Sequence, residues 1–102
     1  MREYDVYVPL HYNDGREIEG EKLSALKRRL VEEFGGLTHF PQENEGLWQV
    51  GTYTFRDRIV ILRVLAGDSS KADQFFLRLK EDLKSEWAQE DVLIVTRTVS
   101  AV

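Results

Sequence analysis

Hydrophobic and polar residues alternate over the first ten positions, and this period of two predicts a β-strand from Arg2 to Leu10. From about Glu19 the period becomes that of a helix, whose apolar stripe comprises Leu23, Leu26, Leu30 and Phe34. The pair Gly35-Gly36 predicts the end of this helix, because glycine readily adopts the left-handed conformation found at helix C-termini.

The middle of the chain predicts an irregular β-hairpin. Its first strand starts at Leu37, is interrupted at Pro41 and resumes over Gly46–Val50. A long strand from Tyr53 to Leu65 follows, and its second half is apolar on both faces, as expected for a central strand. The remaining pattern predicts a second helix and a last strand over Val92–Val99; the helix stripe would comprise Ala72, Phe76, Leu79, Leu83 and Trp87.

The predicted order of elements is strand, helix, strand, strand, helix, strand. Right-handed crossovers convert this order into one four-stranded antiparallel sheet with both helices on one face. The expected fold is therefore α+β and ferredoxin-like (βαββαβ), and residues 1–102 are expected to form a single domain.

The sheet face that the helices leave bare is not polar in this sequence. Alternation assigns to it Tyr7, Ile59, Ile61 and Arg63, with some of Trp48, Tyr53 and Phe55. A contiguous apolar patch on a small protein usually marks an interface or a ligand surface. We expect the face to pair with a second copy in a homodimer, since symmetric dimers are the commonest oligomers. A small molecule or a different protein partner is the alternative.

Arg63 lies in an apolar strand, where an unpaired charge is costly. Asp5 on the first strand is expected on the same face, and Arg97 on the last strand could join them. Two alternatives follow. An Asp5–Arg63 pair could set the strand register, or Arg63 and Arg97 could bind an anion in a cavity between subunits.

Composition narrows the function classes. The chain has no cysteine and a formal net charge of −4, which disfavours thiolate chemistry and nucleic-acid binding. Its apolar runs are too short to span a bilayer and its start is charged, so a cytoplasmic protein without a membrane partner is expected. His11 and His39 are the only histidines and lack metal-ligand spacing, so no metal is expected.

Candidates for catalysis are few. His39 could act as a general base if a cleft surrounds it, and Asp57 could take part if it reaches a cavity. Asp14 lies where ferredoxin-like nucleases of the CRISPR adaptation type carry a metal-binding aspartate, although Asn13-Asp14-Gly15 also has the composition of a simple turn. The sequence contains no phosphate-binding loop, dinucleotide fingerprint or nucleophile elbow, so no cofactor is expected.

A pattern in the centre of the chain resembles a family of small uncharacterised bacterial proteins, some of them encoded beside defence genes. The pattern consists of Phe34-Gly35-Gly36-Leu37-Thr38, Gly46-Leu47-Trp48, Gly51 and Asp57. The resemblance implies a ferredoxin-like fold. Its glycines would shape the helix exit and the hairpin, and Trp48 would anchor the irregular strand.

The sequence therefore predicts a binding or assembly module that is homodimeric through its open sheet face, and an accessory role in a defence or regulatory operon is one expectation for it. The alternatives are a small-molecule enzyme or sensor of the dimeric α/β-barrel type and a metal-dependent nuclease. The residues expected to bind a ligand or partner are Tyr7, His39, Trp48, Ile61, Arg63 and Arg97.

Overall fold

The computed structural model describes residues 1–68 and 70–102, and its elements follow the order predicted from the hydrophobic pattern. They are β1 (Arg2–Pro9), α1 (Gly20–Phe34), β2 (Thr38–Val50), β3 (Tyr53–Ala66), α2 (Ser70–Glu86) and β4 (Ile94–Thr98). The four strands form one antiparallel sheet in the order β2-β3-β1-β4. The α+β ferredoxin-like fold is confirmed.

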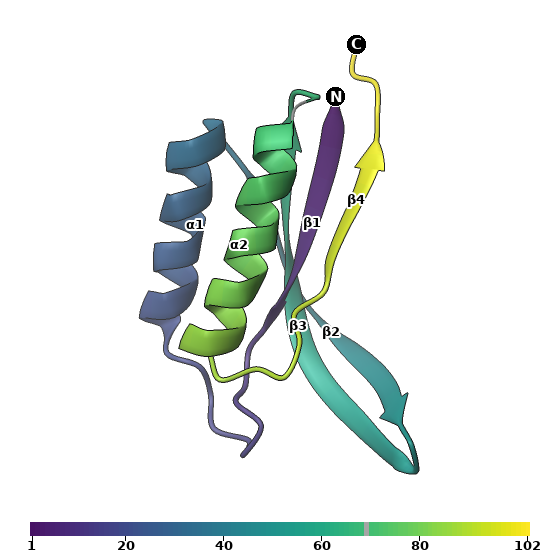
Figure 1. Ribbon diagram of the computed structural model, residues 1–102. Coiled ribbons are helices and arrows are strands. Elements are labelled where there is room, and N and C mark those ends of the chain that lie inside the picture. The colour runs from purple at the N-terminus through teal and green to yellow at the C-terminus, as the bar shows by residue number, and fades with distance from the viewer. Residues whose placement is uncertain (69) are drawn as a thin grey trace.

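Both helices cover the same face of the sheet, and they lie side by side there (Figure 1). The core between helices and sheet is built from alternate positions of the two central strands: Tyr4, Val6 and Val8 on β1, and Val60, Leu62 and Val64 on β3. The helices contribute Leu26, Leu30, Ala72, Phe76, Leu79 and Leu83, and Trp87 closes the layer just after α2. None of the helices in the described residues has the length and apolar character needed to span a membrane.

Helix α1 ends as its sequence predicts. Gly35 adopts the left-handed conformation, with φ at 83°, and its backbone N–H donates a hydrogen bond of 2.8 Å to the carbonyl oxygen of Val31. A side chain at position 35 would be strained at this φ.

The irregular hairpin is present, but strand β2 does not break at Pro41. It runs continuously from Thr38 to Val50, and the irregularity is a register shift between Phe40 and Asn44. The pairing with β3 lapses at Pro41, since the pairs stop at Phe40 and resume at Asn44, and an edge strand accommodates a proline there.

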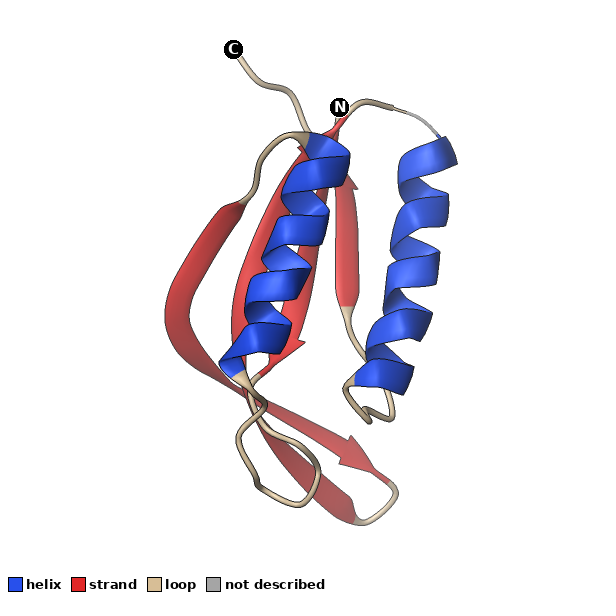
Figure 2. Cartoon of the chain, turned by 90° about the vertical axis from the view of Figure 1, so that its left-hand side faces the viewer, coloured by secondary structure: helices blue, strands red, loops and turns tan. Residues whose placement is uncertain are grey.

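The hairpin extends beyond the rest of the sheet as a two-stranded arm, which we define as residues 44–58. Pairing between β1 and β3 stops at Pro9 and Ile59, and beyond one hydrogen bond of 3.0 Å from the backbone N–H of Leu10 to the carbonyl oxygen of Arg58, the first part of β3 pairs with β2. Figures 1 and 2 show the arm projecting past the ends of both helices. It closes at Gly51, which has a positive φ of 61°. Neither of the two described helices covers a face of the arm.

Candidate functional site

A groove of about 460 Å³ lies on the face of the sheet that the helices leave bare. Its floor carries Tyr7 and Pro9 from β1, and Ile59 and Ile61 from β3. These side chains point away from the core because they alternate with the buried positions of the same strands. The floor of the groove is thus apolar because both faces of these strands carry apolar residues and the helices cover only one of them.

The groove has two walls that come from distant parts of the sequence. The arm forms one wall and contributes residues 44–48 and Asp57. The connection from α2 to β4 forms the other wall through Gln89 and residues 91–93. The backbone N–H of Tyr7 donates a hydrogen bond of 3.0 Å to the carbonyl oxygen of Leu93, which ties this second wall to β1.

Trp48 places a large flat ring on the arm wall. It lies opposite Phe55 in the strand register, and the two rings pack edge to face with their centroids 6.4 Å apart. Trp48 nevertheless remains 44% exposed, so it is not an anchor of the main core. This exposed part of the ring is available to a molecule in the groove.

Asp57 also lines the groove, and its surroundings differ from those of its charged neighbours. Arg56 forms an ion pair of 3.7 Å with Glu45, and Arg58 forms one of 3.1 Å with Glu43. The partly buried carboxylate of Asp57 has no hydrogen-bond donor or cation among the residues that the structure describes. Burial raises the pKa of this carboxyl above its usual value.

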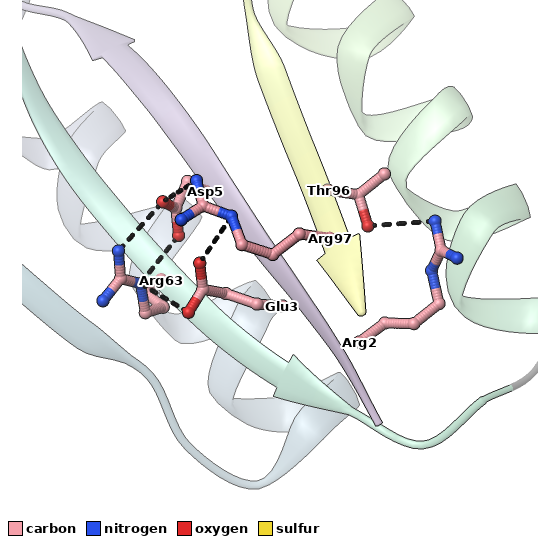
Figure 3. A network of polar contacts seen from close by, with 6 residues as sticks. All are labelled: Arg2, Glu3, Asp5, Arg63, Thr96 and Arg97. Atoms are coloured by element: carbon pink, nitrogen blue, oxygen red, sulfur yellow. Dashed lines mark hydrogen bonds and ion pairs between the residues drawn. The ribbon is translucent and has the colours of Figure 1, made fainter. Parts of the chain in front are cut away.

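Four charged side chains form a cluster on the same face, beside the groove and toward the other end of the sheet (Figure 3). Arg63 binds Asp5 through two hydrogen bonds of 2.9 and 3.1 Å, and it lies 3.2 Å from Glu3. Arg97 lies 3.2 Å from Glu3 and 3.6 Å from Asp5. We call these four residues the charge quartet.

The charge quartet shows the pairing arrangement that the sequence left open. Asp5 and Arg63 are direct cross-strand partners, so their bond reports the register of β1 on β3. Asp5 and Glu3 are buried, with 3% and 8% of their surface exposed. Their two negative charges balance the two arginines, so Arg63 and Arg97 have no uncompensated charge with which to hold an anion.

His39 lies on the other face of the sheet. It pairs with Leu62, a core residue, and therefore points toward the helices. Its Nε2 is buried without a hydrogen-bond partner in the described part of the chain. Burial, and to a lesser extent the charge of Lys27, lower the pKa of His39. The structure thus separates His39 from the groove that Tyr7, Trp48 and Ile61 line.

Asp14 lies in an exposed turn that follows β1, as the composition of that segment predicts. Its carboxylate accepts hydrogen bonds from the backbone N–H of Arg16 at 3.0 Å and from the Arg16 guanidinium at 2.7 Å. Both contacts lower the pKa of the Asp14 carboxyl. Within residues 1–68 and 70–102, no three histidine, aspartate or glutamate side chains are grouped so that they could hold a metal ion.

Sequence reasoning named Asp57 but had no argument for placing it in a site. The usable signal was alternation, because Asp57 is two residues before Ile59 and therefore faces the same side of β3. By the same rule His39 and Trp48 lie on opposite faces of the sheet, because their positions differ by an odd number. The wall from the α2–β4 connection had no sequence signal.

Comparison with known proteins adds a fold neighbour. No protein-family model matches the chain, and no curated protein matches it. Among solved structures, the chain is similar to a phage SAM lyase in complex with S-methyl-5′-thioadenosine, with a TM-score of 0.64 and 15% sequence identity. The match covers 94% of this chain and 79% of the lyase chain. At this identity the likeness shows a shared fold and nothing finer.

Proposed function

We propose that this protein is a small-molecule-binding module whose ligand occupies the groove on the open sheet face. The observation that carries the proposal is the exposed ring of Trp48 beside an apolar floor formed by Tyr7 and Ile61. Recesses of several hundred Å³ with apolar walls and few polar groups are typical of ligand sites. A flat, partly apolar molecule suits this lining best.

The fold neighbour suggests which flat molecule to try first. The phage SAM lyase binds S-methyl-5′-thioadenosine, which combines a planar purine with a short apolar thioether. Stacking of a purine on Trp48 would use the exposed part of the indole, and the thioether would lie on the aliphatic floor. We therefore propose nucleosides of this kind as the ligand class.

Replacing Trp48 with alanine is expected to weaken nucleoside binding at least about fivefold, because a stacked aromatic contributes roughly 1–3 kcal/mol per base. The measurement is isothermal titration calorimetry with S-methyl-5′-thioadenosine and, separately, S-adenosylmethionine. Chemical-shift mapping on the wild-type protein would locate either ligand.

Leu77→Ala is the matched control, because Leu77 is 67% exposed on α2, away from the groove. It should bind as the wild type does. The proposal fails if Trp48→Ala binds with unchanged affinity, or if the shifts of the bound protein gather away from the groove.

A second candidate function is self-association through the open face and the arm. Several large apolar side chains on the arm are exposed by 41–74%: Leu47, Trp48, Val50, Tyr53 and Phe55. A two-stranded ribbon is only marginally stable alone, and exposed apolar residues on it favour a covering partner. The charge quartet is balanced, so a second copy could approach this face without net repulsion. We propose a homodimer.

Light scattering coupled to size exclusion at micromolar concentration is expected to show twice the 11.9 kDa mass of one chain. A Leu47→Ser/Tyr53→Ser variant should elute as a monomer, since it removes two of the exposed apolar groups of the arm. Leu77→Ser, with a comparable exposed leucine on α2, should leave the dimer intact. A monomeric wild-type protein would contradict self-association and leave the ligand proposal standing.

A further inference from the structure

The groove contains three acidic side chains, and two of them are already neutralised. Glu45 lies 3.7 Å from Arg56, and Asp91 lies 3.3 Å from Lys80. Asp57 has no such partner in the described residues, although it is more buried than either. It is therefore the carboxylate whose charge remains available to a molecule in the groove.

The strand register explains why Asp57 stays unpaired. Its cross-strand partner is Gly46, which has no side chain to offer a hydrogen bond or to fill the space above the carboxylate. A Cβ at position 46 would meet only the backbone oxygen of Asp57, at an ordinary 3.8 Å. Gly46 has no positive φ, so the backbone does not require glycine here.

An unpaired carboxylate on an apolar surface costs free energy and contributes nothing to packing. Asparagine would have nearly the same volume without the charge. The raised pKa of Asp57, caused by burial, reports this cost. Ionisable groups that destabilise the folded state in this way are typical of binding and catalytic sites.

We propose that the carboxylate of Asp57 binds a positively charged group of the ligand, so that the groove selects cationic small molecules over neutral ones of the same shape. This inference rests on the proposed function and specifies it. The ligand then combines a flat ring, in contact with Trp48, with a protonated amine or another cationic centre next to Asp57.

The charged groups around Asp57 are compatible with this assignment. Glu45 and Asp91 share the groove with it, and neither repels a cation. His11, Arg56 and Arg58 line a second recess, which Asp57 also borders. The two arginines there are bound to glutamates, so they leave the charge of Asp57 uncompensated.

The test compares two ligands that differ in one charge: adenosine and 5′-amino-5′-deoxyadenosine, whose amine is protonated at neutral pH. Calorimetry on the wild-type protein at low salt should show at least about fivefold tighter binding of the amine, the magnitude of one partly solvated ion pair. Asp57→Asn should reduce this ratio to about one. Asp82→Asn removes a carboxylate of α2 that lies outside the groove and is paired with Arg29 at 2.9 Å, so this variant should retain the ratio.

The outcomes separate this inference from the proposed function. Binding of both nucleosides with equal affinity overturns the role of Asp57 and leaves the groove as the ligand site. Binding of neither overturns the nucleoside class, and the pair tryptamine and tryptophol then tests the charge alone. No preference for the amine in that pair, or a preference that Asp57→Asn retains, overturns the inference.

Asp57→Asn is also expected to raise the melting temperature at pH 7 by a few degrees, up to about 4 °C. The folded-state pKa of Asp57 lies above its unfolded value, so the stability linked to its protonation is lost as pH rises through the folded pKa. The difference in melting temperature between the variant and the wild type should therefore shrink as the pH is lowered through the folded-state pKa of Asp57. A variant that melts below the wild type at pH 7 would make Asp57 a structural residue and overturn its assignment as a ligand group.

Discussion

Asp5→Ala is expected to lower the free energy of unfolding by about 2–4 kcal/mol, because removing one partner from a buried ion pair leaves the remaining charge uncompensated. Asp5 is 3% exposed and accepts both hydrogen bonds from Arg63. Without it, Glu3 alone would face two arginines. Urea denaturation of the wild type and the variant at neutral pH gives the difference.

The double variant Asp5→Leu/Arg63→Leu is the informative control. It removes one charge of each sign and leaves the Glu3–Arg97 pair of 3.2 Å intact. Replacing a buried ion pair with apolar residues is often nearly neutral, so the double variant should lose much less stability than the sum of the two single variants. Additive losses would show that Asp5 and Arg63 act independently and that their bond does not set the strand register.

The second large effect is expected at Leu62, and its chain neighbour Ile61 provides the comparison. Leu62→Ala should cost about 2–5 kcal/mol, because its side chain is fully buried against the helices and its loss leaves a cavity. Ile61→Ala should cost under about 1 kcal/mol in the monomer, since Ile61 faces the groove and is only partly buried.

This comparison also tests what the open face is for. The two variants differ by one position on β3, so local backbone effects are closely matched. Denaturation should be followed at two protein concentrations. A loss at Ile61 as large as that at Leu62, and independent of concentration, would mean that the open face belongs to the folding core and is no binding surface.

Much of the fold could be predicted from local pattern. A period of two marks β1, a period near 3.6 marks both helices, and Gly35 marks the end of α1. These predictions succeed because each depends on neighbouring residues of one segment. The interruption predicted at Pro41 is present in the pairing with β3, which lapses between Phe40 and Asn44. The strand nevertheless continues because an edge strand accommodates proline, and whether a strand lies at the edge depends on the order of all four strands.

The candidate site was predictable only in part. Alternation identified Tyr7, Ile61 and Arg63 as residues of the bare face, since a side chain's face follows from its parity along the strand. The partners of those side chains are long-range. Glu3 joins the charge quartet, and the wall at residues 91–93 meets β1 through the sheet topology.

The sequence by itself determined which segments are strands and helices, which faces of them are apolar, and that one sheet face would remain bare. Only the tertiary structure decided that Arg63 and Arg97 are neutralised while Asp57 is not. The physical reason is that the free energy of a charge depends on what lies within a few ångströms of it. Those neighbours come from strand register and from the connection after α2, which bring together residues far apart along the chain.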